Sequence, residues 1–430
     1  MNDLTLLFDF IRRSPSPWHA VKTAAEALEK AGFARLEERE SWALAPGGKY
    51  YATREGSSLI AWRQPDAPAA GWRIAAAHSD SPAWRVKGAA VKNGCTMLLT
   101  EGYGGMIRAS WMDRPLGLAG RVLVRTAAGV ESRLVAPDRD LAVMPHPAIH
   151  LDRGLNDGHK YDPKTDMQAL FAPGDRTADY QALLAAEAGC AVKDILGADI
   201  LLCCRQEGAT AGAGGELILC PRLDDLACAW ATLQGFLEAP ASPGGAAWCL
   251  FDSEEVGSGT RQGALGTFLP DVLAAASEAL GETEDERRQG IAKSLALSAD
   301  NGHALHPNFA ALSDGDFPVR LGGGVVLKFN ADQKYTTTGL TAALFKAVCE
   351  GAGVPVQTYY NRPDMPGGST LGNLLGTRVP LPMADIGLPQ LAMHSCVETA
   401  AASDVAALHK ACAAWYAAKL TPAEHGWAIG

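Results

Sequence analysis

The stretch RIAAAHSDSP, residues 73–82, indicates how this chain of 430 residues folds. A short apolar run stops at His78, and a polar turn that contains Asp80 follows it. A run of this length between polar segments is typical of a strand buried on both faces. The same pattern recurs at AWCLF (247–251), SLALS (294–298) and PQLAM (389–393). Because ligands bind at the carboxyl ends of strands in an open α/β sheet, we expect the residues after these runs to share one crevice.

The texture of the chain changes between its two halves. Short alternating segments such as GRVLVRTAAG (120–129) and GADILLC (197–203) lie among glycine, proline and aspartate residues, which predicts a mainly β insertion. A chain of this length also exceeds one ordinary core, so that two domains are expected. The predicted spans are residues 1–88 and 216–430 for an α/β domain in two parts, and residues 89–215 for the insertion.

Composition and charge exclude several classes of protein. Hydrophobic residues make up 47% of the chain and charged residues 20%, as in globular proteins with a packed core. The net charge of −10 disfavours nucleic acid as a partner, because phosphate binding needs clustered Lys and Arg. The start MNDLTLLFDFIRR resembles neither a secretory signal nor a spanning helix, so we expect no membrane association. Ten cysteines without a C-x-x-C pair are typical of reduced thiols, and we expect a cytoplasmic protein.

The residues that follow the apolar runs are suited to holding metal ions. Zinc bound through oxygen and nitrogen needs histidines and carboxylates that converge from separate elements. Asp224 begins the helix-like run in CPRLDDLACAW (220–230), where one carboxylate could bridge two ions. Glu254 and Glu255 are adjacent and point in different directions, so that one can be a general base and the other a ligand. The candidate set is His78, Asp224, Glu254, Glu255, Asp300 and His394.

Seven ordered stretches resemble the signature segments of the M18 metallopeptidases, the aspartyl aminopeptidases. They are AAHSDSP (76–82), CPRLDDL (220–226), FDSEEVGSG (251–259), LSADNGHALHPN (297–308), KFNADQKYTTTG (328–339), NRPDMPGGSTLG (361–372) and DIGLPQLAMHS (385–395). The likeness extends from about residue 15 to residue 405 in the order of the family. Asp225 departs from it, because the family usually has asparagine there, and this change implies an extra negative charge near the metals.

The resemblance implies a peptidase centre with two Zn²⁺ ions per subunit. The implied zinc ligands are His78 and Asp300 for one ion, Glu255 and His394 for the other, and Asp224 as the bridge between them. By the same likeness, Glu254 would be the general base that activates water. Asp80 would orient His78, since histidines that bind metals usually donate their other ring nitrogen to a partner.

The resemblance also implies a fold and an assembly. The family has an α/β zinc-peptidase domain whose mixed, mainly parallel sheet is flanked by helices. A β-rich dimerisation domain interrupts it, here at residues 89–215. The implied assembly is a homododecamer built from dimers, and the implied substrates are peptides.

Three further residues are assigned to substrate binding by the resemblance. His150, in MPHPAIHLDRGLND (144–157), would reach the active site of a neighbouring subunit; a histidine in a surface loop explains it equally well. Lys328 would meet the acidic side chain of the substrate, with Tyr335 beside it. The alternative for Lys328 is a strand residue whose ammonium group extends to solvent.

We therefore expect a two-zinc metallo-aminopeptidase that prefers N-terminal Asp or Glu. Two alternatives remain open. A carboxypeptidase or deacylase would use the same metal residues, but it needs a cation for the substrate carboxylate where an aminopeptidase needs an acidic group for the α-ammonium. A catalytically silent assembly protein would keep the fold, although such proteins typically lose a ligand or the base. The chain lacks G-x-G-x-x-G, G-x-x-x-x-G-K-[ST], H-E-x-x-H and G-x-S-x-G, which other enzyme classes require.

Overall fold

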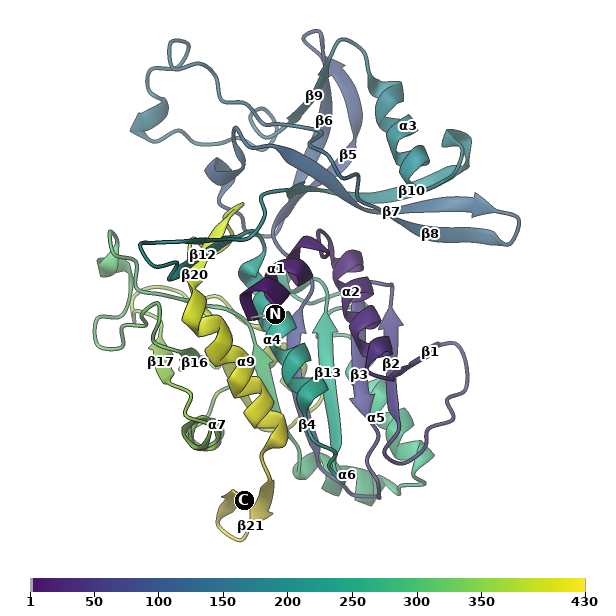
Figure 1. Cartoon of the computed structure of the whole chain (residues 1–430), viewed down its shortest axis with the longest axis vertical. Coiled ribbons are helices and arrows are strands. Elements are labelled where there is room, and N and C mark those ends of the chain that lie inside the picture. Colours follow the sequence, from purple (N-terminus) through teal and green to yellow (C-terminus); the bar gives the residue numbers. More distant parts are fainter. Residues whose placement is uncertain (1–2, 430) are drawn as a thin grey trace.

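The chain folds into a large α/β part with a smaller β-rich part above it (Figure 1). The computed structural model describes residues 3–429, so residues 1–2 and 430 of the predicted spans lie outside the described part. The N-terminal helix lies near the junction of the two parts, and the C-terminal hairpin lies at the far end of the α/β part.

A nine-stranded sheet forms the centre of the α/β part. Its strands are, in spatial order, β1 (Ala34–Leu36), β2 (Lys49–Arg54), β3 (Ser58–Arg63), β13 (Gly245–Phe251), β4 (Trp72–His78), β14 (Leu295–Ala299), β18 (Met383–Gly387), β16 (Val325–Phe329) and β17 (Val356–Tyr360). The four central strands, β13, β4, β14 and β18, run parallel. Antiparallel pairs β3–β13 and β16–β18 flank them, which confirms the predicted mixed, mainly parallel sheet.

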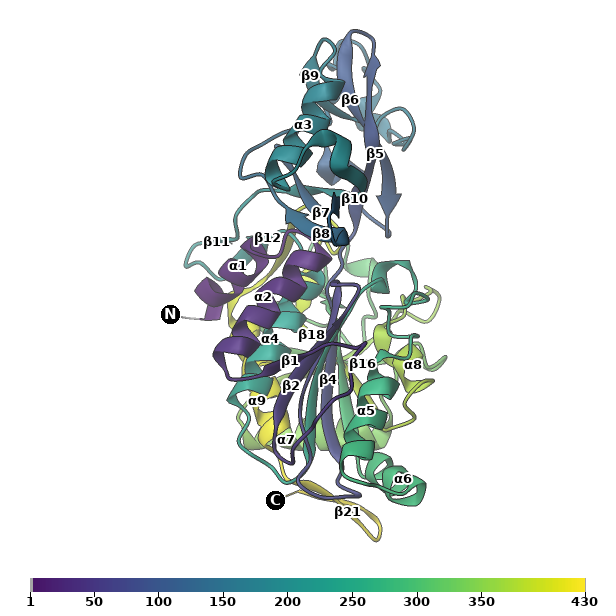
Figure 2. The same ribbon diagram turned by 90° about the vertical axis from the view of Figure 1, so that its right-hand side faces the viewer.

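Helices cover both faces of this sheet, as Figure 2 shows from the side. One face packs against α1 (Asp3–Arg12), α2 (Pro17–Lys30), α4 (Leu223–Glu238), α7 (Gly339–Gly351) and α9 (Ala402–Ala417), and the other against α5 (Phe268–Ala279), α6 (Glu284–Ala292) and α8 (Leu371–Gly376). Side chains alternate along β4, so that Ala75 and Ala77 join the first core and Ile74 and Ala76 join the second. Burial on both faces is why this strand has an uninterrupted apolar sequence.

The β-rich part has a sheet and a core of its own. Its strands are, in spatial order, β8 (Gly129–Val135), β7 (Leu116–Thr126), β10 (Ile195–Cys204), β5 (Ala83–Lys92), β6 (Cys95–Tyr103) and β9 (Ala169–Pro173). Neighbouring strands are all antiparallel, and α3 (Thr177–Glu187) contributes Tyr180 and Leu184 to the same core. These strands come from residues 83–204, whereas the sequence placed the β-rich insertion at residues 89–215.

A third, five-stranded sheet corrects one prediction from the sequence. Its strands are β11 (Ala209–Ala211), β12 (Leu217–Cys220), β20 (Glu398–Ala401), β19 (Pro389–Leu391) and β15 (Gly302–His303). The run that precedes His394 therefore belongs to this sheet and not to the large one. The chain leaves the large sheet after Gly387, where a Cβ atom would lie 1.9 Å from the carbonyl oxygen of Asp300. A hairpin of β21 (Leu420–Ala423) and β22 (Gly426–Ile429) ends the described chain.

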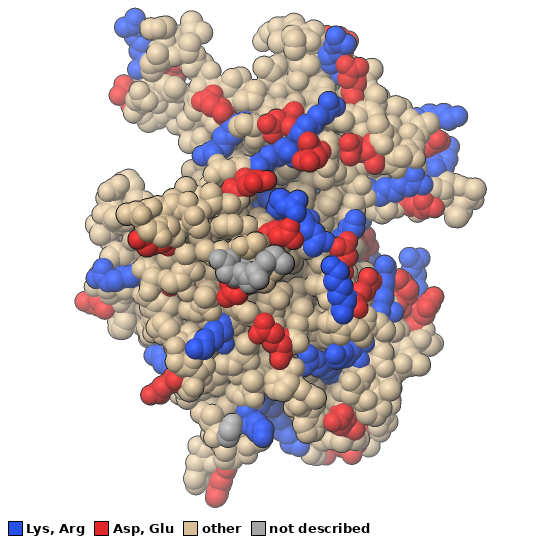
Figure 3. Space-filling model, in the orientation of Figure 1, with Lys and Arg blue, Asp and Glu red and all other residues tan. Residues whose placement is uncertain are grey.

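The surface and the helices bear on possible partners. None of the helices between residues 3 and 429 has the length and apolar character that crossing a bilayer demands. On the face shown in Figure 3, Lys and Arg side chains lie among Asp and Glu side chains over both parts of the molecule. This face therefore presents no extended electrostatic field of one sign.

The contact between α4 and α9 yields a test of the packing. A Cβ atom on Gly235 would lie 2.6 Å from the carbonyl carbon of Cys412 and 2.7 Å from the nitrogen of Ala413, so the two helices would have to separate. We expect Gly235→Ala to lower the free energy of unfolding by about 1–3 kcal/mol, as overpacking does. The measurement is the urea midpoint of the purified protein.

Gly351→Ala is the matched control, because Gly351 also lies in a helix but has no neighbour within 4 Å of an added Cβ atom. This substitution is expected to be neutral or to stabilise the protein by up to about 1 kcal/mol. Equal midpoints for the two variants would contradict the close helix contact.

Candidate metal centre

The loops after three neighbouring strands place acidic and histidine side chains at one edge of the large sheet. His78 is the last residue of β4, and Asp300 follows β14 directly. Glu254 and Glu255 lie in a short 3₁₀ helix (Glu254–Val256) behind β13. Since these strands are parallel neighbours, their carboxyl ends meet as the sequence predicts.

Asp224 lies between two histidines. Its Oδ1 atom is 3.6 Å from Nε2 of His78, and its Oδ2 atom is 3.3 Å from Nε2 of His394. Nε2 of His394 is also 3.3 Å from Oε1 of Glu255. Asp224 has non-helical backbone angles although it lies in the first turn of α4, and its side chain is 3% exposed. Each carboxylate oxygen of Asp224 thus faces a different histidine.

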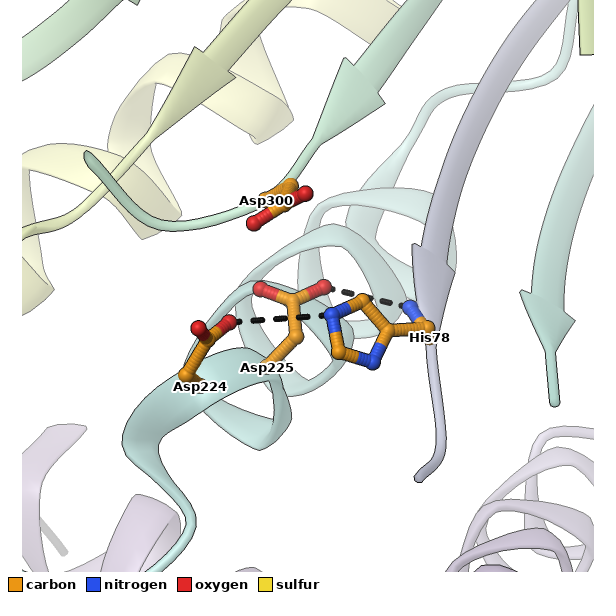
Figure 4. A group of neighbouring side chains, drawn as sticks. All are labelled: His78, Asp224, Asp225 and Asp300. Atoms are coloured by element: carbon orange, nitrogen blue, oxygen red, sulfur yellow. Dashed lines mark hydrogen bonds and ion pairs between the residues drawn. The ribbon is translucent and has the colours of Figure 1, made fainter. Parts of the chain in front are cut away.

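Metal-competent atoms form three overlapping groups here. Within each group, the candidate ligand atoms lie within 4.8 Å of one another. The groups are His78, Asp224, Asp225 and Asp300; His78, Glu254 and Glu255; and Asp224, Glu255 and His394. Figure 4 shows the first group, with the three carboxylates and the imidazole turned toward a common centre. The structure therefore brings all six predicted residues together, and it adds Asp225.

Unpaired oxygens show that these residues fit a metal cation. Oδ1 of Asp224, Oδ1 of Asp225 and Oε1 of Glu255 are buried, and none has a hydrogen-bond partner among the described residues. Buried polar atoms are almost always paired, so such a set is suited to coordination. Imidazole nitrogens and carboxylate oxygens are donors that zinc accepts.

Electrostatics in the metal-free centre also call for cations. Burial raises the pKa of Glu254 to about 8 and the pKa of Asp300 to about 6, the latter against the opposing charge of Lys328. Burial also raises the pKa of Glu255. For His394, burial works to lower the pKa, but the carboxylates of Asp224 and Glu255 raise it to about 10. The centre therefore favours positive charge, which metal ions can supply.

Asp80 holds two of the segments that carry candidate ligands. Its carboxylate accepts hydrogen bonds from the backbone N–H groups of Glu254 and Glu255, both at 3.1 Å, and from the hydroxyl of Tyr103 at 2.7 Å. Nδ1 of His78 donates to the carbonyl oxygen of Asp80 at 3.0 Å, which directs Nε2 toward the centre. Asp80 is therefore placed to orient His78, and it also fixes the glutamate pair.

The β-rich part reaches the centre on the other side. Nδ1 of His394 donates to the carbonyl oxygen of Gly105 at 2.8 Å, and the backbone N–H of Ile107 donates to the carbonyl oxygen of His394 at 3.0 Å. Gly105 and Ile107 follow β6 directly. The orientation of the His394 ring is thus fixed by the loop after β6.

The predicted substrate residues are placed in three different ways. Lys328 is 2% exposed, and its ammonium donates to the carbonyl oxygens of Asp300 at 2.7 Å and Asn301 at 3.1 Å. It therefore lies beneath the centre, in neither the open pocket nor the outward position considered from the sequence. Tyr335 is 5% exposed, and its ring lies 5.2 Å from Nζ of Lys328. His150 is exposed and belongs to none of the metal-competent groups of residues 3–429.

Sequence reasoning missed two residues of the centre. Asp225 was noted only as a departure from the family, yet its Oδ2 atom accepts the backbone N–H of His78 at 3.1 Å. Glu398 was not considered, although its carboxylate accepts the backbone N–H groups of Asp224 and His394. The available signal was a single glutamate in the strand sequence ETAA, four residues after His394.

The sheet with helices on both faces and the buried cluster of His and carboxylate groups define the class of the protein as an α/β metallohydrolase. The profile of the aminopeptidase I zinc metalloprotease family, M18, matches residues 10–416. The chain belongs to the M18 family, and it is a metallo-aminopeptidase. This finding confirms the resemblance and the class of enzyme predicted from the sequence.

Relatives and solved structures agree over nearly the whole chain. A probable M18 family aminopeptidase 2 from Pseudomonas aeruginosa (strain LESB58) is 40% identical over 97% of this chain and 98% of its own length. The structure of a complex of Ape4 and Nbr1 superposes with a TM-score of 0.93 at 32% identity, covering 96% of this chain and 85% of that one. The S. cerevisiae mApe1 dodecamer gives a TM-score of 0.85 at 26% identity, covering 96% and 97%.

The crowded carboxylates predict how pH changes the effect of zinc on stability. A folded-state pKa of about 8 for Glu254, against 4.5 for a free glutamate, contributes stability that is present below about pH 4.5 and lost as the pH rises through 8. Zinc needs the same carboxylates ionised, so its binding strengthens over this window. The stabilisation by zinc should therefore grow from about pH 4.5 to about pH 8.

Thermal midpoints of chelator-treated protein, recorded with and without Zn²⁺ at one scan rate, measure this difference. Free zinc at 100 times its Kd corresponds to about 2.7 kcal/mol of added stability. A zinc effect that is absent, or that shrinks as the pH rises, would count against a carboxylate-rich metal centre.

Proposed function

We propose that the protein is a two-zinc aminopeptidase that removes N-terminal residues from peptides and prefers Asp or Glu. The observation that carries the proposal is the position of Asp224, whose two oxygens face His78 at 3.6 Å and His394 at 3.3 Å. A carboxylate in this position is suited to bridging two ions. His78 and Asp300 would complete one site, with Glu255 and His394 completing the other.

The chain's own residues supply the remaining chemistry. Bound zinc would polarise the scissile carbonyl and lower the pKa of a water molecule. Glu254, held at its backbone N–H by Asp80, faces the same centre beside His78 and Glu255. We assign it as the general base that takes a proton from the attacking water and passes it to the leaving amine nitrogen as the peptide C–N bond breaks.

Recognition of a free N-terminus is supported by the charge of the crevice. An α-ammonium group needs acidic partners, and the centre is built mainly from carboxylates. The carboxypeptidase and deacylase alternatives need an available cation, whereas the ammonium of Lys328 is buried against two carbonyl oxygens. N-acetylated anilides should therefore be poor substrates, and hydrolysis of blocked and free substrates at equal rates would refute this assignment.

Glu254→Gln is expected to lower kcat by about 10²- to 10⁴-fold, because it removes proton transfer and keeps the shape of the side chain. Zinc content and the unfolding midpoint should stay near those of the wild type. Steady-state kinetics with an Asp-anilide, together with metal analysis, make the test. Glu187→Gln is the matched control, since Glu187 is exposed on α3 and should leave kcat unchanged.

Turnover at the wild-type rate by Glu254→Gln would contradict its role as base. His394→Ala should behave differently and lower zinc content together with the rate, because it removes a proposed ligand. Normal zinc content in His394→Ala would argue against that ligand.

The acidic preference is assigned to Lys328 and Tyr335. An ammonium group has three donors, and the carbonyl oxygens of Asp300 and Asn301 use two of them. The third donor can meet a substrate carboxylate, with the ring of Tyr335 5.2 Å away. A charge-assisted hydrogen bond of this kind strengthens the binding of Asp and Glu over apolar residues.

Lys328→Met should lower the ratio of kcat/KM for a Glu-anilide to that for a Leu-anilide by about tenfold or more. The ratio is the readout, because losing the contact with Asp300 will also lower both rates. Lys346→Met is the control, since Lys346 is exposed on α7 and its ammonium meets only Thr358. An unchanged ratio would remove Lys328 from substrate selection.

We also propose self-association into a homododecamer built from dimers. The S. cerevisiae mApe1 relative is described as a dodecamer, and several of the solved relatives share this fold. Ile149 is 46% exposed and Leu151 82% exposed on either side of His150, so a second subunit could cover them and receive the histidine. The ten cysteines are all free, which supports the proposed cytoplasmic location.

A further inference from the structure

Glu398 is a buried carboxylate that holds two backbone segments of the metal centre. It is 2% exposed at the start of β20. Its Oε1 atom accepts the backbone N–H of His394 at 2.7 Å, and its Oε2 atom accepts the backbone N–H of Asp224 at 2.9 Å. Each oxygen of Glu398 therefore fixes the main chain of one proposed zinc ligand.

Neither of these ligand segments is fixed by regular secondary structure. His394 has a φ of +66°, a left-handed conformation that a residue with a side chain adopts only when its surroundings enforce it. Asp224 has φ −84° and ψ 108° inside the first turn of α4, where helical angles are otherwise the rule. A short hydrogen bond to a charged acceptor is the interaction that can hold such backbones in place.

The contacts continue from Glu398 toward the other side of the centre. Nε2 of Gln390 donates to Oε1 of Glu398 at 3.4 Å, and Nδ2 of Asn301 donates to Oε1 of Gln390 at 3.0 Å. Asn301 directly follows Asp300, and both Gln390 and Asn301 are buried. A chain of buried hydrogen bonds thus runs from the segment of Asp300 to the segments of Asp224 and His394.

We propose that Glu398 is a positioning residue of the metal centre, which sets the separation of Asp224 and His394 at which both bind metal. Gln390 supports it and links it to the segment of Asp300. This inference rests on the proposed two-zinc function, and it concerns the site of Glu255 and His394 most directly. Glu398 touches neither the substrate nor the reacting atoms, because it acts only through the backbones of the ligands.

Asp404 provides the comparison that separates positioning from simple stabilisation. It is a buried carboxylate, 1% exposed, whose oxygens accept the backbone N–H groups of Gly322 at 2.7 Å and Gly324 at 2.8 Å. It thus has the same chemistry as Glu398, but the residues that it holds belong to a turn before β16 and not to the metal centre. A purely structural role would make the two carboxylates equivalent.

The test is the zinc affinity of Glu398→Gln in the full-length protein, measured by competition with a chromogenic chelator. The amide keeps the shape of the side chain, but its NH₂ group cannot accept one of the two backbone N–H groups. We expect one of the two zinc ions to bind about 10- to 100-fold more weakly, as when the partners of metal ligands are lost. The value of kcat should fall and recover in excess zinc, while KM changes less than about twofold.

Asp404→Asn is the control, with an unfolding midpoint that falls and two zinc affinities that stay at wild-type values. The proposal is overturned if Glu398→Gln loses stability as Asp404→Asn does and still binds both ions with wild-type affinity. Should Glu398→Gln not fold, Gln390→Met decides, since it removes the supporting hydrogen bond: weaker zinc binding supports the proposal and unchanged binding contradicts it. A wild-type protein that saturates at one zinc would instead refute the two-zinc function itself.

Discussion

Buried carboxylates cannot share a dry crevice without positive charge between them, and this constraint governs the centre of the molecule. Candidate ligand atoms of Asp224, Asp225 and Asp300 lie within 4.8 Å of one another and of His78. Burial raises the pKa of such groups because the ionised form loses its hydration, and neighbouring negative charges add to the cost. A metal ion relieves both effects, so that metal binding and the stability of this region are linked.

The large sheet brings these groups together, and hydrogen bonds then set their separation. Parallel strands deliver His78 and Asp300 to one edge, but strand geometry alone leaves the following loops free to move. Two buried carboxylates restrict them: Asp80 binds the backbone of the glutamate pair, while Glu398 binds the backbones of Asp224 and His394. Backbone N–H groups held in this way form a rigid frame around the open ligand positions.

Much of the fold could be predicted because burial on both faces leaves a readable trace. Strands such as β4 are apolar throughout, so their ends at His78 and before Asp300 were visible in the sequence. The sheet that carries PQLAM was not, since a three-residue apolar strand looks the same in any sheet. The direction of Lys328 was also hidden, because it depends on carbonyl oxygens of a distant segment. Glu398 escaped notice for the same reason: its partners are main-chain atoms, which have no sequence signature.

The loop after β6 makes the β-rich part an integral wall of the reaction site. Tyr103 donates to Asp80, Gly105 accepts from the ring of His394, and Ile107 donates to the main chain of His394. A protein trimmed to the nine-stranded sheet and its helices would retain every candidate ligand but would leave one imidazole free to rotate. The smallest unit capable of peptide hydrolysis is therefore the uninterrupted polypeptide, and its two parts must have diversified under shared selection.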